Sequence, residues 1–203
     1  MIAILDYDAG NLRSVEKAFL YLNQEVTVTA DPKTILSADR VVLPGVGAFR
    51  DAMDKLTKAG LDSVVKEVVA QQKPFLGICL GMQLLYEYSE EGDCPGLGIL
   101  GGTVKRFPAE SGLKIPQIGW NQLTLQKESK LLGKAIAAPY VYFVHSYYVD
   151  AVDKSTVAAT VEYGAQADVL VETGSVFLTQ FHPEKSGKVG LSMLKNFAEG
   201  TNL

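Results

Sequence analysis

A strand-like apolar stretch that runs into a glycine-flanked cysteine constrains this chain more than any other feature. Residues 75–78 have the composition of a buried strand, and Cys79 follows between Gly77 and Gly81 in a Gly-x-Cys-x-Gly turn. Residues 82–86 predict a helix after the turn. A strand, a sharp turn and a helix form a nucleophile elbow, in which small neighbours make room for the reactive side chain and the helix N-terminus favours a thiolate. The segment therefore places Cys79 at the carboxyl end of a strand in an α/β fold.

The other predicted elements indicate a doubly wound α/β domain with a mostly parallel sheet flanked by helices. In the first half, short β-type runs alternate with amphipathic segments, and Val15 and Phe19 lie on the apolar face of a helix over 11–22 for which Asn11 is the predicted N-cap. From about Thr103 to Glu172 the pattern becomes β-rich, which predicts an antiparallel excursion beside the main sheet. The predicted strands are 2–5, 25–29, 40–43, 75–78, 118–125, 140–144, 156–163 and 176–181, and the predicted helices are 11–22, stretches within 48–72, and 189–198.

Length and composition restrict the class of protein. With 203 residues, 47% of them hydrophobic, and a net charge of −4, the chain can form a single domain over residues 1–203 with a well-filled core. The basic residues are scattered, which argues against a nucleic-acid partner. The first residues lack the pattern of a signal peptide, and nothing predicts a membrane span, so we expect a cytoplasmic protein. Cys79 and Cys94 are the only cysteines, so neither a disulfide framework nor a metal site is expected.

A second apolar strand supplies the partners of the cysteine. Residues 176–181 end in His182-Pro183-Glu184. Because ligands of open α/β sheets bind outside the carboxyl ends of the strands, His182 and Cys79 can meet there. A free thiol has a pKa of about 8.5, so an effective nucleophile needs a base such as His182. If the strand geometry continues past residue 181, Glu184 lies on the same side as His182 and can orient it. The alternative is that Cys79 is a small buried hydrophobe and His182 a loop histidine.

Two backbone segments can supply donors to an oxyanion. The N–H group of Leu80 begins the helix after the cysteine, and the 44–47 loop contains two glycines that allow it to turn the N–H of Val46 or Gly47 toward a ligand. A Pro-Gly-x-Gly sequence is also an ordinary turn. The oxyanion role of this loop is therefore one of two interpretations.

The remaining conspicuous residues allow more than one interpretation. His145 is the only other histidine and can act as a second base, but no nucleophile is near it in the sequence. His145, Ser146 and Tyr147 then line a pocket or lie at a strand end. Trp120, the sole tryptophan, is by itself more typical of core packing than of a partner contact.

The pair of motifs resembles a known family. Residues 77–83, Gly-Ile-Cys-Leu-Gly-Met-Gln, followed far downstream by His-Pro-Glu, resemble the class I, or triad, glutamine amidotransferases, which release ammonia from glutamine through a thioester. Within that class the chain is similar over nearly its whole length to the glutaminase subunits of imidazole glycerol phosphate synthases. The stretches that carry this similarity are 6–7, 10–15, 44–49, 118–121, 143–147 and 181–186.

The resemblance implies roles for single residues. Cys79 corresponds to the nucleophile, His182 to the acid and base, and Glu184 to its orienting partner. Gln83 corresponds to a residue that holds the α-carboxylate or amino group of glutamine, together with Gly47 and the backbone around residues 146–147. The family has a class I Rossmann-like fold and uses no cofactor in this reaction.

The resemblance also implies a partner. Family members work with a separate (β/α)8 cyclase subunit, which receives the ammonia through an interior channel in histidine biosynthesis. Asn11, Trp120 and Lys185 correspond to positions that face this partner. Gln117 departs from the family pattern, which has histidine there, and the difference bears on the partner surface.

The residues by themselves are also compatible with two other functions. A stand-alone cysteine hydrolase or peptidase can use the same elbow, and it would be active without a partner. A binding or regulatory protein can keep the fold without the activity, and loss of a triad residue would indicate it. All three triad residues are present.

Overall fold

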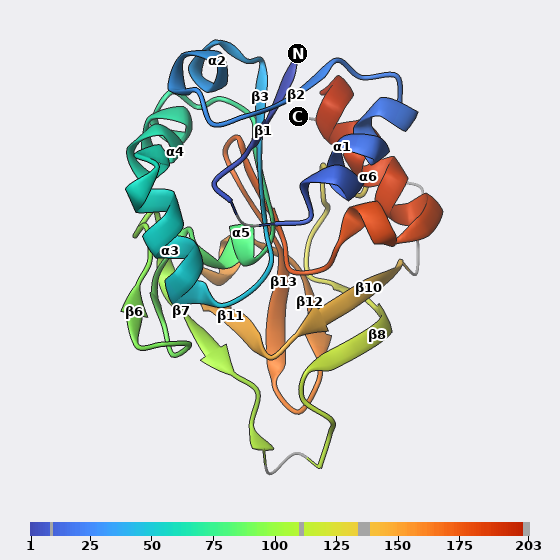
Figure 1. Cartoon of the computed structure of the whole chain (residues 1–203). Coiled ribbons are helices and arrows are strands. Elements are labelled where there is room, and N and C mark those ends of the chain that lie inside the picture. The colour runs from blue at the N-terminus through green and yellow to red at the C-terminus, as the bar shows by residue number, and fades with distance from the viewer. Residues whose placement is uncertain (9, 110–111, 134–138, 201–203) are drawn as a thin grey trace.

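The computed structural model describes residues 1–8, 10–109, 112–133 and 139–200. A mixed sheet runs through the molecule, with helices on both of its faces (Figure 1). Helices α2, α3 and α4 cover one face, and α1 and α6 cover the other. The helices are α1 (Leu12–Tyr21), α2 (Pro32–Ser37), α3 (Phe49–Lys58), α4 (Leu61–Ala70), α5 (Leu80–Gln83) and α6 (Gly187–Glu199), with 3-10 turns η2 (Lys154–Thr156) and η3 (Pro183–Lys185).

The parallel half of the sheet contains five strands whose order confirms the doubly wound prediction. The order is β2 (Val26–Thr29), β1 (Ile2–Leu5), β3 (Arg40–Gly45), β4 (Phe75–Cys79) and β14 (Val176–Thr179), and each neighbouring pair is parallel. The carboxyl ends of these strands therefore meet at one edge of the sheet.

The predicted antiparallel excursion is present and extends the same sheet. From β14 the order continues through β13 (Gln166–Thr173), β11 (Tyr147–Ala151), β7 (Leu100–Arg106), β5 (Tyr86–Ser89) and β6 (Cys94–Pro95), while β12 (Val157–Glu162) pairs with β13 and β9 (Thr124–Leu125) with β12. The β5–β7 pair is parallel, and the other pairs of this part are antiparallel. Only β8 (Gln117–Gln122) and β10 (Tyr140–His145) form a second sheet among the described residues.

Alternation along the parallel strands divides the interior into two cores. In β1, Ala3 and Leu5 point to the core under α2, α3 and α4, whereas Ile2 and Ile4 point to the core under α1 and α6. Side chains of a strand alternate between faces, so strands buried on both sides must be apolar throughout. This requirement explains the unbroken hydrophobic runs in the sequence.

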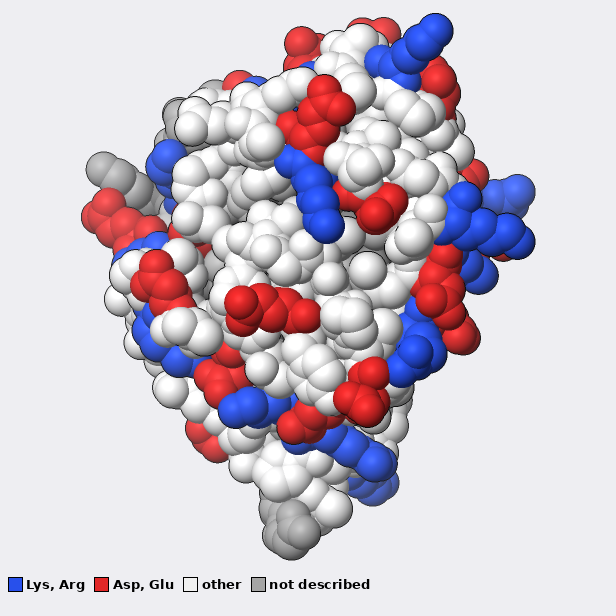
Figure 2. Space-filling model, turned by 90° about the vertical axis from the view of Figure 1, so that its left-hand side faces the viewer, with Lys and Arg blue, Asp and Glu red and all other residues white. Residues whose placement is uncertain are grey.

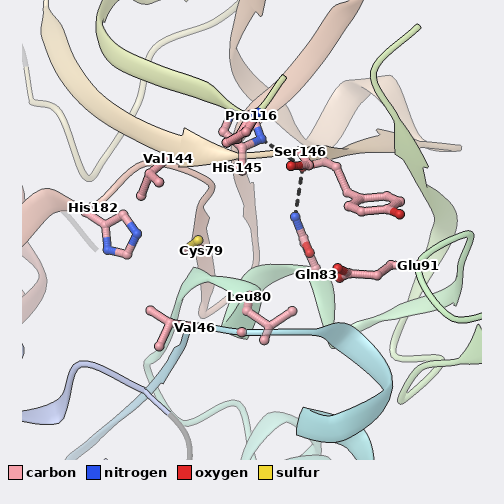
Figure 3. A pocket seen from close by; sticks show the side chains of 12 residues that line it. Val46, Cys79, Leu80, Gln83, Glu91, Pro116, Val144, His145, Ser146 and His182 are labelled. Carbon is pink, nitrogen blue, oxygen red and sulfur yellow. Dashed lines mark hydrogen bonds between the residues drawn. The ribbon is translucent and has the colours of Figure 1, made fainter. Parts of the chain in front are cut away.

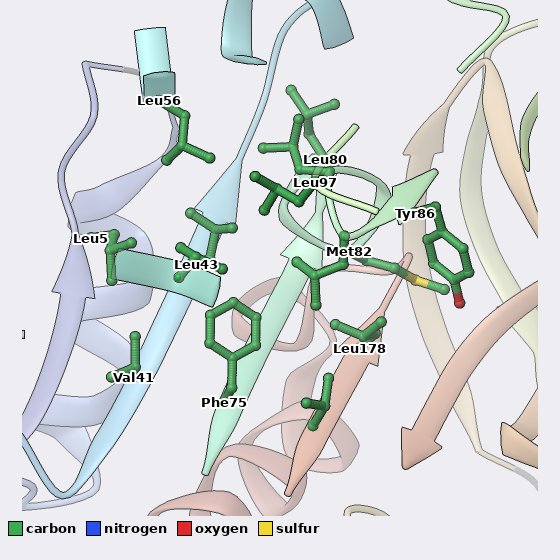
Figure 4. Close-up of a cluster of buried hydrophobic side chains, with 14 of the residues drawn as sticks. Leu5, Val41, Leu43, Leu56, Phe75, Leu80, Met82, Tyr86, Leu97 and Leu178 are labelled. Carbon is green, nitrogen blue, oxygen red and sulfur yellow. The ribbon is translucent and has the colours of Figure 1, made fainter. Parts of the chain in front are cut away.

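The first of these cores surrounds the elbow. Figure 4 shows Leu80 and Met82 of α5 packed among side chains from β3, β4 and β14. Both residues are almost fully buried, and full burial of one such side chain stabilises a fold by about 1.5–3 kcal/mol. The turn that carries Cys79 is thus anchored by this core.

Two details of the helices differ from the sequence prediction. Helix α2 was not predicted, although Asp31 before Pro32 is a typical start signal and its carboxylate accepts a hydrogen bond from the Thr34 N–H at 3.0 Å. Asn11 stands at the start of α1, but its side chain accepts from the Ser14 hydroxyl and does not cap the helix backbone.

The surface carries charges of both signs. On the face shown in Figure 2, Lys and Arg side chains are interspersed with Asp and Glu, as expected for a net charge of −4. No helix in the described part of the chain is long and apolar enough to cross a membrane.

Candidate active site

Cys79 occupies a strained backbone position at the end of β4. Its φ is 55° and its ψ is −112°, a region that residues with a Cβ atom rarely adopt. The helix after it is shorter than predicted, because α5 ends at Gln83 and Tyr86 already begins β5. A helix of one turn has little macrodipole. Any backbone stabilisation of charge at Cys79 therefore comes from the N–H groups at the start of α5.

Close packing explains the two glycines of the elbow. A Cβ atom on Gly81 would lie 1.9 Å from the carbonyl oxygen of Leu43 in β3. A Cβ atom on Gly77 would lie 2.9 Å from the carbonyl oxygen of Gly81 and 2.7 Å from a methyl group of Leu178. Neither contact can be relieved by a side-chain rotation alone, because backbone atoms are involved in both. The turn requires glycine at these positions.

His182 is fixed by its backbone as well as by its ring. Its N–H donates to the Tyr142 carbonyl at 3.1 Å, and its own carbonyl accepts from the Ser186 hydroxyl at 2.6 Å. Strand β14 ends at Thr179, before the predicted limit at Phe181, and residues 183–185 form η3. The side chains of His182 and Glu184 are nevertheless together, since their Nδ1 and Oε1 atoms are 2.9 Å apart. A 3-10 turn, not a continued strand, produces this alignment.

Burial and two neighbouring groups shift the pKa of His182 in opposite directions. The ring is 2% exposed and the Glu184 carboxylate 0% exposed. Burial lowers the pKa of His182, but the Cys79 sulfur and the Glu184 carboxylate outweigh it and raise the pKa to about 9. The Nε2 atom is buried without a hydrogen-bond partner among the described residues. It is therefore available to a group that binds beside Cys79.

A pocket of about 380 Å³ opens over Cys79, a size suited to a small molecule. Figure 3 shows the His182 ring and the Cys79 sulfur across from Gln83 and Glu91. The pocket brings together all of the predicted catalytic and binding residues except Glu184, which lies behind His182. The lining includes Cys79, His182, Val46, Gly47, Leu80, Gln83, His145, Ser146 and Tyr147.

The predicted ligand-binding atoms are partly occupied by the protein itself. The Gln83 amide nitrogen donates to the Tyr147 carbonyl at 3.0 Å and to the Gln180 side-chain oxygen at 2.8 Å. The Ser146 carbonyl accepts from the Phe107 N–H at 3.1 Å. Gln83 can therefore offer a ligand its amide oxygen, an acceptor that suits an amino group and not a carboxylate.

His145 is a neutral histidine of the pocket wall. Its Nδ1 atom lies 2.7 Å from the Tyr147 carbonyl, which can only accept, so Nδ1 carries the proton and Nε2 is the acceptor. Burial lowers the pKa of His145 to about 4. The ring also packs against Phe107 and Phe143. These contacts agree with a pocket-lining residue.

Two residues of the site were missed in the sequence. Glu91 lines the pocket, and its Oε2 atom accepts from the Phe49 N–H at 2.9 Å at the start of α3. Burial raises the pKa of this carboxyl group. Gln180 is fully buried, and its amide nitrogen lies 3.7 Å from the Cys79 sulfur. Gln180 directly follows the last residue of β14 and precedes His182 by two residues.

The remaining predicted positions lie outside the pocket. Trp120 is 53% exposed and forms an edge contact with Tyr142, so it is not a core residue, and Lys185 is exposed on η3. Asn11 is half-buried at the start of α1. The Gln117 side chain is buried and donates to Asn121 at 2.8 Å.

Cys94 is buried apart from this site, against α3. No cluster of three or more His, Cys, Asp or Glu side chains among the described residues is arranged to hold a metal ion.

The low pKa of His145 makes the stability of the fold depend on pH. An unfolded histidine takes up a proton near pH 6.5, whereas folded His145 does so near pH 4, so stability falls as pH decreases through this window. Between about pH 7 and about pH 5, we expect His145 to account for a loss of about 2 kcal/mol in the free energy of unfolding. Urea unfolding of His145→Asn, which keeps a donor for the Tyr147 carbonyl, should show a correspondingly smaller loss.

A matched control is His182→Asn. The pKa of His182 is raised, so its contribution to stability is complete below about pH 6.5 and is lost only as pH rises toward 9. Between about pH 7 and about pH 5 the contribution of His182 still grows by about 1 kcal/mol as pH falls, because the unfolded histidine titrates there, so this variant should lose more stability than the wild type, the opposite of His145→Asn. An equal slope in wild type and His145→Asn would contradict the assignment of a neutral His145.

Comparisons with known proteins identify the family. The model of the family "Glutamine amidotransferase class-I" matches residues 3–200. The chain is 52% identical to the imidazole glycerol phosphate synthase subunit HisH of Thermosynechococcus vestitus, over 97% of this chain and 95% of that one. It is 48% identical to HisH of Oceanobacillus iheyensis, over 98% of each chain.

Solved structures agree at the level of the fold. A crystal structure of a glutamine amidotransferase is similar with a TM-score of 0.76 at 19% identity, covering 98% of this chain and 99% of that one. A structure of PurLQS from Thermotoga maritima is similar with a TM-score of 0.73 at 19% identity, over 98% and 97% of the two chains. Together with the sequence matches, this shows that the chain belongs to the class I glutamine amidotransferases and, within them, to the HisH family.

Proposed function

We propose that this chain is the glutaminase subunit of an imidazole glycerol phosphate synthase, a single amidotransferase domain that hydrolyses glutamine to glutamate and ammonia. The observation that supports it most is the buried His182–Glu184 pair facing Cys79 in a pocket of about 380 Å³. Membership of the HisH family points to the same reaction.

In the first half of the reaction, Cys79 forms a bond to the side-chain carbonyl carbon of glutamine. In this proposal the N–H of Leu80 and an N–H from the Val46–Gly47 segment stabilise the resulting oxyanion. His182 is protonated at neutral pH, since its pKa is about 9, and it gives this proton to the departing nitrogen. The carbon–nitrogen bond breaks, ammonia leaves, and a thioester of Cys79 remains.

In the second half, His182 is neutral and removes a proton from a water molecule that attacks the thioester. The carbon–sulfur bond then breaks, which releases glutamate and restores the sulfur anion beside protonated His182. Glu184 keeps the ring oriented and stabilises its charged form through both halves.

The far wall of the pocket suits the α-amino group of glutamine. Glu91 uses only Oε2 for the Phe49 N–H, so Oε1 can accept from an ammonium group. The Gln83 amide oxygen and the neutral Nε2 of His145 are further acceptors in the lining. This arrangement assigns Gln83 to the amino group of the substrate and leaves the α-carboxylate to other donors.

An exposed apolar face beside the pocket suits the cyclase subunit. One side of the β8–β10 sheet is buried, whereas the other exposes Ile118, Trp120 and Tyr140 by 62%, 53% and 51%. Val144 on the same side of β10 lines the pocket, so this docking face reaches the site. The Tyr142 carbonyl of β10 also holds the His182 N–H. Apolar surface of this kind, rimmed by polar residues, marks protein–protein contacts.

The proposal includes the partner and the fate of the ammonia. The chain forms a heterodimer with a (β/α)8 cyclase, which takes up the ammonia through an interior channel in cytoplasmic histidine biosynthesis. Asn11 and Lys185 contribute to the contact from α1 and η3, at the side of the docking face.

Replacement of Cys79 should separate two activities. Cys79→Ala removes the only nucleophile of the site, so glutamine hydrolysis should disappear, while the complex should still form product from added ammonium salt. Ammonia release and cyclase product formation are measured in parallel. Cys94→Ala is the control and should resemble the wild type, because Cys94 is remote from the pocket. Substantial glutamine-dependent turnover by Cys79→Ala would contradict the mechanism.

The two other triad residues should differ in their effect. Both proton transfers pass through His182, so His182→Ala should abolish glutaminase turnover about as completely as loss of Cys79. Glu184→Gln keeps a hydrogen-bond acceptor for the ring and should lose less activity, although it should lower the pKa of His182. Steady-state kinetics and the histidine NMR titration measure the two effects. If His145→Ala were more damaging than His182→Ala, the assignment of the base would be wrong.

Docking of the partner should accelerate the glutaminase. If the N–H donor of the Val46–Gly47 segment is turned into the site only in the complex, the rate should rise by about 10²–10³-fold when cyclase and its nucleotide substrate are added. Gly47→Ala should blunt the rise, because φ is 104° at Gly47. Trp120→Ala should weaken docking, whereas Val152→Ala, an exposed residue outside the docking face, should not. Full activity of the isolated chain would refute this gating and favour the stand-alone hydrolase.

A further inference from the structure

Gln180 is a buried polar residue that none of the steps above uses. It follows the last residue of β14, and its side chain is fully excluded from solvent. Strand β14 runs parallel to β4 with Thr179 opposite Ile78, so the next residue along each strand brings Gln180 beside Cys79. The Gln180 amide nitrogen lies 3.7 Å from the Cys79 sulfur. The pairing of the two strands therefore fixes this contact.

A carbonyl group at the other end of a short chain of hydrogen bonds decides which atom of the Gln180 side-chain amide faces the sulfur. The Tyr147 carbonyl can only accept, so the Gln83 amide must turn its nitrogen toward it, at 3.0 Å. The same nitrogen is 2.8 Å from the side chain of Gln180, which must therefore present its oxygen there. The other end of the Gln180 amide, which faces the sulfur, is then the N–H donor.

A structural role explains this residue poorly. Burial of a primary amide costs free energy unless its groups are hydrogen-bonded, and an aliphatic residue would fill the same space without this cost. The Gln180 backbone N–H already pairs with the Val169 carbonyl at 2.9 Å, so the fold does not need the side chain for that purpose. The side-chain amide has two partners, Gln83 and the sulfur of Cys79.

We propose that Gln180 is a catalytic residue of this site, an N–H donor that stabilises the anionic sulfur of Cys79 before attack and when the thioester breaks. The proposal rests on the proposed function and adds a residue to it. His182 must give its proton away and take it back during the cycle, so its charge beside the sulfur is intermittent. The Gln180 amide has no charge to lose and donates throughout. The Tyr147–Gln83–Gln180 chain keeps it turned the right way.

The rate of Cys79 alkylation by iodoacetamide tests the donor without any need for glutamine. We use the full chain with Cys94→Ala, so that Cys79 is the sole thiol. Hydrogen bonds to charged groups are worth about tenfold to a hundredfold in an equilibrium, and Gln180→Met, which lacks the donor, should slow alkylation at neutral pH by about this factor. The pH at which alkylation is half-maximal should rise by about one unit or more.

The variant Gln180→Glu separates electrostatics from packing. Glutamate has nearly the shape of glutamine and still accepts from Gln83, but it directs an oxygen at the sulfur. A packing role predicts that Gln180→Glu is closer to the wild type than Gln180→Met. The proposed donor predicts the reverse, with Gln180→Glu the slower of the two. Thr179→Val is the matched control, since Thr179 directly precedes Gln180 and its hydroxyl is buried without a hydrogen-bond partner among the described residues. It should alkylate at the wild-type rate.

A measurement on the unmodified residue covers the case in which both Gln180 variants fail to fold. In the wild-type chain, the side-chain amide NMR signal of Gln180 should move with the same pH midpoint as Cys79 alkylation, and Cys79→Ala should remove this titration. An invariant signal, or folded Gln180 variants with wild-type alkylation profiles, would overturn the proposal. If the alkylation results hold but glutamine is not hydrolysed, the donor stands and the proposed function fails.

Discussion

The parallel pairing of β4 with β14 is the constraint on which the site depends. Strand β4 spans residues 75–79 and β14 spans residues 176–179, about a hundred positions further along the chain. The two strands nevertheless pair in a register in which Ile78 lies opposite Thr179. Parallel strands end at the same edge, so whatever follows them must meet. Cys79, Gln180 and His182 meet for this reason. A shift of one residue in this register would turn the Gln180 side chain to the opposite face.

The strained elbow is held by packing that the chemistry does not touch. A non-glycine residue in the conformation of Cys79 costs about 1–3 kcal/mol. Burial of Leu80 and Met82 directly after it contributes a stabilisation of the same order or more. The contact of Gly81 with the Leu43 carbonyl then removes the space in which the turn could relax. The turn that carries Cys79 is thus held by side chains of the core under α2, α3 and α4.

The sequence predicts much of this architecture because the signals are local. Three kinds of signal can be interpreted without knowledge of the tertiary fold. The apolar runs indicate buried strands, the glycines at 77 and 81 indicate the sharp turn around Cys79, and the His-Pro-Glu motif indicates the partners of the cysteine. The hydrogen bond between His182 and Glu184 was predicted from a wrong geometry, since a 3-10 turn and not a strand provides it. Glu91 and Gln180 could not be found in this way. Each has its role through contacts with residues more than forty positions away.

The two histidines show how the same pocket produces opposite protonation states. Burial acts on both and lowers the pKa of each. His145 is surrounded by aromatic rings and a carbonyl group, so nothing opposes burial strongly enough and its pKa is about 4. His182 lies between a sulfur and a carboxylate, and their charges bring its pKa to about 9. Groups whose pKa values are driven apart in this way take different tasks. In the proposed mechanism His182 moves protons at neutral pH. His145 stays neutral and, through its contact with the Tyr147 carbonyl, supports the group that sets the direction of Gln83 and Gln180.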